Sequence, residues 1–403
     1  MVKYVKNSLK VFLWILYFLS GFFPRCKDVC VFGTSGPGFN DNAKHLFVSL
    51  NETNKYKKYV WITSDNKTLA YLRSVGYLCY AKFSIGGIYY CLRSGIYIYN
   101  SYVSDINFWL SRNAMYVNLW HGVPLKKIEF DIRVGPLVTR YNPKNKIDKI
   151  FNKIFYPHIY NKIDILLVPS EKLLPIFSSA FKVKIENCHI SKYPRSEIII
   201  KEKRDIFKIL KKLNEIATID LLEKIENKDN RFLYVPTWRD SGTNIIESAG
   251  LVFEEIDALM GRLNSVFIIK FHPNTKIDLT YLKDFPNIRL LDNVMDIYPI
   301  LPFVDFLITD YSSIYVDFLL IDKEIIFFPF DKEDYLTNNR EMYFNYDEVT
   351  PGKKVLNYEE LITALQHCDE INFSLERERV FDMFYDKKMI DMSPEIINIV
   401  RNL

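Results

Sequence analysis

The chain has 403 residues, which is too long for one ordinary hydrophobic core, because single domains usually hold roughly 100–200 residues. Apolar residues make up 49% of the chain and charged residues 25%, a balance that excludes an intrinsically disordered protein. The net charge of +4 does not support a nucleic-acid binder. The six cysteines form no C-x-x-C pair, so we expect reduced and mostly packed thiols.

The N-terminus combines a basic segment, MVKYVKNSLK, with the apolar residues 11–23. This apolar run is shorter than the roughly 20 residues that a membrane-spanning helix needs. The following FFPRC offers no small-residue cleavage site of a signal peptide. We therefore predict that residues 1–25 form a helix in the membrane interface, with Arg25 and Lys27 among its flanking positive charges. An ordinary packing helix and a signal or spanning segment are the alternatives.

Strand-like and helix-like runs then alternate through the first half of the chain. Strands are expected at residues 29–33, 59–63, 77–82, 96–101, 114–120 and 163–170, and helices at 43–52, 67–76, 84–95, 106–113 and 171–181. This alternation is typical of βαβ units around a parallel sheet.

A lysine-rich helical stretch, residues 197–230, is the expected connection to a second series of the same kind. Strands are expected there at residues 231–238, 266–273, 287–292, 304–310 and 324–331, with helices at 253–263 and from 313 onward. The pattern predicts an α/β fold of two Rossmann-type, doubly wound domains facing a cleft. The domains are expected at residues 26–200 and 201–375, followed by a C-terminal helix, residues 376–403, which we expect to pack onto the first half.

Unusual polar residues stand where the predicted strands end, which is where ligands bind in such sheets. They are His121 in NLWHGVPLKK, Lys270 and His272 in KFHPN, and Ser312 and Ser313 in TDYSS. Together with Arg195 in KYPRSE, they suit an anion that carries several phosphate oxygens.

Each of these residues also has a purely structural interpretation. Ser312 and Ser313 begin a helix, whose free N–H groups favour phosphate, although serine is also an ordinary N-cap. Lys270 and His272 are two residues apart and so point to the same side, and a lysine in a buried strand is costly unless it is paired. Arg195 could clamp a phosphate or lie on the surface.

Asp317 lies four residues after Ser313, on the same face of the expected helix. Its carboxylate could accept a hydrogen bond from a ligand hydroxyl or be a plain surface group. The Gly-rich loop GTSGPGFNDN lacks both the G-x-G-x-x-G spacing and a Walker lysine, so we interpret it as an acceptor-side loop. The remaining histidines lack metal-ligand spacing, and no metal or other cofactor is predicted, with any divalent-metal requirement left open.

Four motifs together, NLWHGVPLKKI, YVPTWRD, KFHPN and the long DFLITDYSSIYVDFLLIDKEIIFFPFD followed by NNREMYFNYDEVTPG, resemble the CDP-glycerol glycerophosphotransferases. These enzymes make teichoic acids and related capsular polymers, and the resemblance covers about residues 29–385. It implies a GT-B-like fold and a peripheral enzyme at the cytoplasmic face of the bacterial cell membrane. The implied partners are CDP-glycerol, an undecaprenyl-diphosphate-linked acceptor and the membrane surface, without nucleic acid.

The resemblance also assigns roles to individual residues. His121 and His272 are the implied catalytic pair, with His121 as general base because the pKa of histidine lies near neutrality. The implied CDP-glycerol site consists of His121, Gly122, Val123, Pro124, Leu125, Arg195, Pro236, Thr237, Lys270, Phe271, His272, Ser312, Ser313 and Asp317.

The chain departs from the family pattern at two points. Val123 stands where the family often has threonine, and KYPRSE replaces the commoner GYPRND. These changes leave the alditol open, so CDP-ribitol is a second candidate donor. A nucleotide-sugar glycosyltransferase on the same fold and a catalytically idle membrane scaffold are also compatible with the sequence.

Overall fold

The computed structural model describes residues 2–53, 57–239, 244–272, 275, 279–338, 341–386 and 395–403. The chain forms two compact units. Unit 1 contains Met1–His121, Ile128–Glu197 and Asp386–Leu403, and unit 2 contains Gly122–Lys127 and Ile198–Tyr385. The chain therefore enters unit 2 briefly after His121, returns to unit 1, and passes into unit 2 again near the expected boundary at residue 200.

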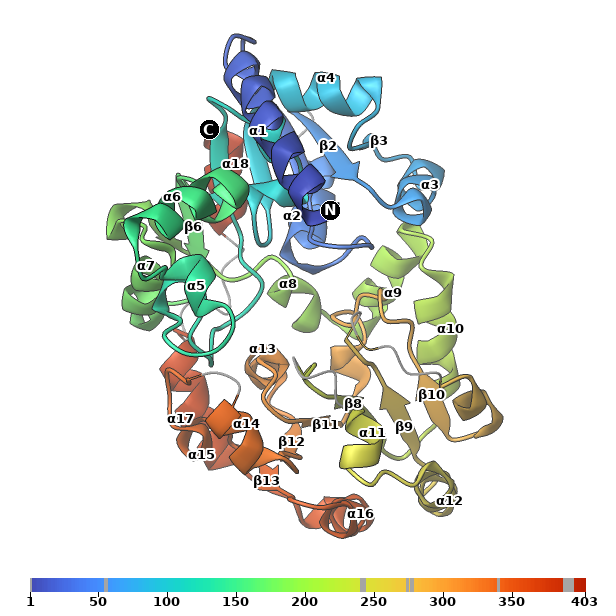
Figure 1. The fold of residues 1–403 in the computed structure, drawn as a ribbon. Helices are drawn as coiled ribbons and strands as arrows, with labels where there is room; N and C mark the ends of the chain where they lie inside the picture. The colour runs from blue at the N-terminus through green and yellow to red at the C-terminus, as the bar shows by residue number, and fades with distance from the viewer. Residues whose placement is uncertain are drawn as a thin grey trace. The chain divides into compact units, whose positions relative to one another are not determined.

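Unit 1 is built on a seven-stranded parallel sheet in the order β3-β2-β1-β4-β5-β6-β7 (Figure 1). Its strands are β1 (Cys26–Gly33), β2 (Lys58–Thr63), β3 (Cys79–Ala81), β4 (Ser94–Tyr99), β5 (Met115–Asn118), β6 (Ile165–Val168) and β7 (Cys188–Ile190). The strand order reverses between β1 and β4, which makes the loops after these two strands the topological switch point of the sheet.

The helices of unit 1 begin where the sequence supplies capping groups. Asp65 accepts a hydrogen bond from the backbone of Thr68, and Ser84 accepts one from Gly87, as N-cap residues do. The helices of this unit are α1 (Val2–Ser20), α2 (Asp41–Thr53), α3 (Asn66–Ser74), α4 (Ile85–Arg93), α5 (Val138–Tyr141), α6 (Lys146–Phe155), α7 (Leu174–Phe181) and α18 (Glu395–Asn402). Helix α8 (Ser196–Ile199) spans the division between the units.

Helix α1 packs on unit 1 through aromatic side chains. Tyr17 stacks on Phe108 with 4.7 Å between ring centroids, and the indole N–H of Trp14 donates to the carbonyl of Ile154 at 3.1 Å. The Arg25 guanidinium donates to backbone carbonyls of unit 1, among them that of Cys91 at 2.6 Å. This residue therefore ties the end of α1 to unit 1. Among the described helices, none is long and apolar enough to cross a membrane.

Unit 2 is built on a six-stranded parallel sheet in the order β10-β9-β8-β11-β12-β13. Its strands are β8 (Arg231–Val235), β9 (Val266–Ile269), β10 (Ile288–Leu290), β11 (Phe306–Thr309), β12 (Glu324–Phe327) and β13 (Lys353–Lys354). Its helices are α9 (Lys203–Lys212), α10 (Ile216–Ile225), α11 (Ile245–Ser248), α12 (Phe253–Arg262), α13 (Ile314–Phe318), α14 (Lys332–Asn338), α15 (Tyr346–Val349), α16 (Tyr358–Gln366) and α17 (Ser374–Phe384). The prediction of two parallel α/β sheets is confirmed.

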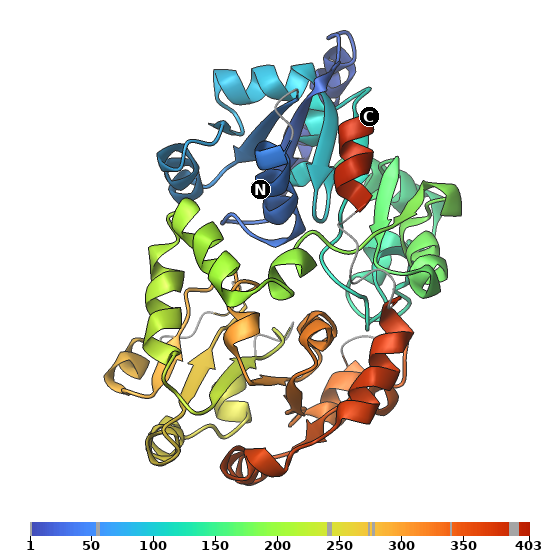
Figure 2. The same cartoon turned by 180° about the vertical axis from the view of Figure 1, so that it is seen from behind.

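The tail differs from one continuous C-terminal helix. Helix α17 belongs to unit 2, whereas α18 belongs to unit 1 and contacts α2 there (Figure 2). The helix expected at residues 106–113 is only a short 3-10 turn, Phe108–Leu110, which the Asn107 side chain caps by accepting from the Trp109 backbone.

Candidate active site

His121 follows β5 on a strained backbone. Trp120 has a φ of 53°, which is rare for a bulky side chain, and its N–H donates to the Asn118 side chain at 2.9 Å. The Trp120 ring lies 4.0 Å from the His121 ring, centroid to centroid, and the imidazole is exposed.

The imidazole of His121 is held in one orientation and favours its neutral form. Its Nδ1 lies 3.2 Å from the hydroxyl of Ser101. Desolvation by the surrounding protein lowers its pKa below the usual 6.5, and the guanidinium of Arg195 lowers it further, while the Asp41 carboxylate and the Asn100 backbone oppose the shift. A neutral imidazole can accept a proton, which a general base must do.

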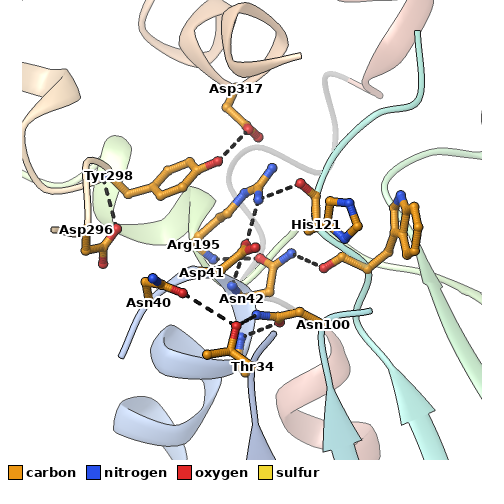
Figure 3. Close-up of polar contacts among 12 residues, drawn as sticks. Thr34, Asn40, Asp41, Asn42, Asn100, His121, Arg195, Asp296, Tyr298 and Asp317 are labelled. Carbon is orange, nitrogen blue, oxygen red and sulfur yellow. Dashed lines mark hydrogen bonds and ion pairs between the residues drawn. The ribbon is translucent and has the colours of Figure 1, made fainter. Parts of the chain in front are cut away.

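Arg195 is buried and contacts both the start of α2 and the backbone of His121. It is 2% exposed, and its Nη1 pairs with the Asp41 carboxylate at 2.6 Å and donates to the His121 carbonyl at 2.9 Å (Figure 3). Asp41 begins α2 with a φ of 63°, which aspartate tolerates better than most residues. Arg195 therefore positions the loop that carries His121, a role that sequence reasoning did not give it.

Three amides that the sequence did not single out complete this network. Asn42 donates to the Trp120 carbonyl at 3.0 Å, and Asn100 accepts from the Ala43 backbone at 2.9 Å while donating to Thr34 at 3.0 Å (Figure 3). Asn118 supports the Trp120 backbone as described above. The only sequence signal was the polar FNDN segment of the Gly-rich loop.

The segment after His121 belongs to unit 2 and pairs with a second family motif. The Leu125 carbonyl accepts from the Tyr343 N–H at 2.8 Å, and the Lys127 N–H donates to the Glu341 carbonyl at 2.8 Å. Gly122, Val123, Pro124 and Leu125 are buried. The side chains of Val123 and Leu125 are both 3% exposed, so these side chains are not available to a ligand.

The ends of β8 and β11 meet in unit 2. The Thr237 N–H donates to the Asp310 carboxylate at 2.9 Å, and Pro236 beside it is buried. Ser312 and Ser313 are half-buried, and within the described chain Ser313 makes no side-chain capping hydrogen bond at the start of α13. Because α13 has only 5 residues, the helix dipole adds less here than the sequence suggested.

Lys270 and His272 follow β9, as expected from KFHPN. The Lys270 ammonium donates to the Asn293 carbonyl at 3.0 Å, and burial lowers its pKa. The His272 side chain is exposed on one side. Desolvation by the protein on its other side, together with the positive charge of Lys270, lowers its pKa. Phe271 is 2% exposed and packs in the core of unit 2, so its side chain is not available to a ligand.

Asp317 is buried rather than on the surface. Its carboxylate accepts from the hydroxyl of Tyr298 at 3.1 Å (Figure 3) and from that of Tyr385 at 3.3 Å. Tyr298 and Tyr385 were not identified from the sequence, because aromatic residues are frequent in this chain. Within the described residues, no group of three His, Cys, Asp or Glu side chains could hold a metal ion, and all six cysteines are free thiols.

Residues 15–390 match the family CDP-glycerol:poly(glycerophosphate) glycerophosphotransferase. The chain belongs to this family. It is therefore a transferase, as the sequence motifs indicated. Its similarity to curated relatives extends over nearly its full length.

A teichoic acid poly(glycerol phosphate) polymerase of Bacillus spizizenii is 27% identical and is covered over 98% of both chains. A teichoic acid glycerol-phosphate transferase of Staphylococcus aureus is 28% identical, over 86% of this chain and 85% of the relative. A poly(ribitol-phosphate) polymerase of Bacillus spizizenii is 26% identical, over 77% of this chain and 45% of the relative.

Among solved structures, the wall teichoic acid polymerase TagF superposes with a TM-score of 0.73 at 21% identity, over 100% of this chain and 96% of that one. A TagF variant soaked with CDPG gives a TM-score of 0.74 at 22% identity, over 100% of this chain and 96% of that one. These likenesses establish the fold.

Proposed function

We propose that this transferase moves glycerol phosphate from CDP-glycerol to a hydroxyl group of a lipid-linked acceptor and releases CMP. The observation that carries the proposal is His121, an exposed imidazole with a lowered pKa, fixed by Ser101 and by the Arg195 contact to its carbonyl. An acceptor hydroxyl needs such a base, because its own pKa lies far above neutrality.

In the proposed reaction, His121 takes the proton of the acceptor hydroxyl while its oxygen attacks the phosphorus that bears glycerol. The new P–O bond forms as the bond to the bridging pyrophosphate oxygen breaks, and that oxygen leaves on CMP with the electron pair. Positively charged groups and hydrogen-bond donors would offset the charge that develops on the leaving group.

Unit 2 supplies suitable groups for the donor. Lys270, His272 and the serine pair, Ser312 and Ser313, would contact the pyrophosphate, and Asp317 would accept a hydrogen bond from a glycerol hydroxyl. Support comes from their place at the strand ends of one parallel sheet, where ligands of doubly wound folds bind. The test is CMP release from CDP-glycerol, CDP-ribitol and a nucleotide sugar on one lipid-linked acceptor, with product masses. CMP release from CDP-ribitol alone would make ribitol the donor, and release from none would favour a non-catalytic scaffold.

We further propose that unit 1 binds the cytoplasmic face of the bacterial cell membrane through α1 and α6. Helix α6, which contacts α1, exposes Ile147 (78%), Ile150 (60%) and Phe151 (49%). We call these three residues the apolar face of α6. Lys146, Lys149 and Lys153 follow one another at helical spacing beside it and are exposed too.

An exposed apolar face flanked by lysines is costly in water but suits an anionic membrane surface. Helix α1 adds Phe12 (68% exposed) and Ile15 (55%) to the apolar side chains that unit 1 leaves in solvent. An acceptor that is linked to a lipid would reach the enzyme at this surface.

A further inference from the structure

The His121 imidazole is held by the short segment that follows β4. The hydroxyl of Ser101 lies 3.2 Å from its Nδ1. The backbone of Asn100, the preceding residue, also hydrogen-bonds the imidazole, in the sense that favours a proton on the ring. Acceptors on this side of the ring favour the neutral form with its proton on Nδ1, and the lone pair of Nε2 is then free to accept a proton.

The backbone of Ser101 is fixed on both sides by buried or half-buried side chains. Its N–H donates to Oδ2 of Asp105 at 3.0 Å, and its carbonyl accepts from Nδ2 of Asn118 at 3.1 Å. The N–H of Tyr102 donates to the same Asp105 oxygen at 3.2 Å. The Ser101 hydroxyl therefore projects from a backbone that cannot shift without breaking hydrogen bonds.

The side chain of Tyr102 ties this segment to a buried carboxylate. Its hydroxyl donates to Oε1 of Glu129 at 2.7 Å, and the hydroxyl of Tyr141 donates to the same oxygen at 3.2 Å. Glu129 is 6% exposed. A buried carboxylate is costly unless hydrogen bonds compensate for the lost water, so Glu129 holds the Tyr102 hydroxyl firmly in place.

The backbone of Glu129 is strained. Its φ is 47°, a value that is rare for a long side chain. Glu129 follows the segment Gly122–Lys127 of unit 2, and Trp120, with a φ of 53°, precedes it. Strained residues persist where neighbouring groups fix them, and they cluster at functional sites. The conformation of Glu129 therefore points to a role in the site for its contact with Tyr102.

We propose that Ser101 and Tyr102 are positioning residues for the base, with the Glu129 carboxylate as their anchor. Glu129 holds Tyr102, and Tyr102 keeps the backbone of Ser101 in place. The Ser101 hydroxyl accepts the proton of Nδ1 and leaves Nε2 of His121 to take the proton of the acceptor hydroxyl. The imidazole then carries a proton on each nitrogen, and Ser101 still accepts from Nδ1. The inference rests on the proposed function and names the atom that acts as the base.

The first test compares two tyrosines that contact the same carboxylate. Tyr102→Phe loosens the Ser101 segment, and kcat should fall by about tenfold, because a displacement of about 1 Å can cost about 10²-fold in rate. The KM of the acceptor and the dissociation constant of CDP-glycerol should stay within about twofold. Tyr141→Phe removes a hydroxyl from Glu129 outside the Ser101 segment, so its kcat should stay within about twofold of the wild type. Equal losses of kcat in both variants would make the cluster purely structural and overturn the proposal.

A double-mutant cycle shows whether Tyr102 acts through Ser101. Ser101→Ala removes the hydroxyl at Nδ1 and should lower kcat by about tenfold to a hundredfold. In this background, Tyr102→Phe should change kcat by less than about twofold, because residues that act through one another give non-additive effects. Circular dichroism and urea titration check that each variant folds. Additive losses would mean that Tyr102 acts independently of Ser101, which contradicts the proposal.

Nuclear magnetic resonance separates this inference from the proposed function, because it needs no substrate. With nitrogen-15-labelled histidine, the wild type should show a neutral His121 that is protonated on Nδ1, and the loss of these signals in His121→Ala assigns them. The share of this tautomer should fall in Ser101→Ala and in Tyr102→Phe, and persist in Tyr141→Phe. A proton on Nε2 in the wild type, or the same share in every variant, would refute the positioning roles. If the wild type releases no CMP from CDP-glycerol, the proposed function fails, while the tautomer still decides how His121 is held.

Discussion

Replacement of His121 by alanine should slow glycerol phosphate transfer without weakening CDP-glycerol binding. General base catalysis typically contributes about 10²–10⁴-fold in rate, which corresponds to a barrier increase of about 3–5 kcal/mol. Little folding energy should be lost, because the imidazole is exposed and its side-chain contacts are the hydroxyl of Ser101 and the ring of Trp120. The lower rate of transfer should therefore appear as a lower kcat.

The pH dependence gives a second measurement on the same residue. The pKa of His121 is lowered below 6.5, so at pH 7.5 more than roughly 90% of the imidazole is neutral and active as a base. Activity should hold above pH 6.5 and fall as the pH drops through the lowered pKa. In His121→Ala, the residual rate should lose this acid limb.

The assay is steady-state CMP release with calorimetric CDP-glycerol affinity, and circular dichroism checks the fold. His367→Ala removes a half-exposed histidine of unit 2 that pairs with Glu370, and it serves as the control. Near-normal kcat in His121→Ala, or an unchanged acid limb, would refute the assignment of the base. His272→Ala should instead lower kcat and donor affinity together, because a phosphate contact acts in the ground state as well. The reverse pattern would mean that the two roles are exchanged.

Three further outcomes are expected. Ser312→Ala with Ser313→Ala should weaken CDP-glycerol binding by about 1–3 kcal/mol in calorimetry, and unaltered affinity would remove both serines from the donor site. Replacing the three residues of the apolar face of α6 by serine should reduce binding to anionic vesicles in a sedimentation assay. Turnover of a water-soluble acceptor analogue should stay constant. Full vesicle binding by this variant would contradict the role of α6. Arg239→Met removes the 2.9 Å ion pair of Asp310, whose side chain is 1% exposed. The free energy of unfolding, measured by urea titration, should therefore fall by about 3–5 kcal/mol. A loss under about 1 kcal/mol would show that this ion pair is dispensable.

Hydrophobic periodicity predicted the two sheets well because their central strands are buried on both faces. β2 and β4 in unit 1, and β9 and β11 in unit 2, are buried along almost their whole length and are mostly apolar. The sequence pattern did not indicate the two edge strands β7 and β13, which have 3 and 2 residues. Nor could it show that Gly122–Lys127 joins unit 2, because the pairing of Leu125 and Lys127 with residues 341–343 is a long-range contact.

The places of His121 and Lys270 after strands were predictable, because each follows an apolar run of the sequence. The site was not predictable where a side chain acts through a distant partner. Arg195 and Asp41 are 154 positions apart in the sequence, and no local pattern indicates that they form an ion pair. The sequence therefore suggested a phosphate clamp for Arg195, whereas the structure gives its Nη1 two protein partners.

The backbone around His121 explains why so many supporting groups gather there. Trp120 and Asp41 both hold positive φ values, 53° and 63°, which cost of order 1–3 kcal/mol each and persist only when neighbouring groups fix them. Asn42 contacts the Trp120 carbonyl, and Arg195 contacts both Asp41 and the His121 carbonyl. The hydrogen bonds of these side chains thus offset the strain of the two turns and hold the backbone that carries the imidazole. In the proposed reaction, a base held in this way before its substrate arrives would need no reorganisation when the acceptor hydroxyl binds, which is the condition under which a single histidine lowers a barrier most.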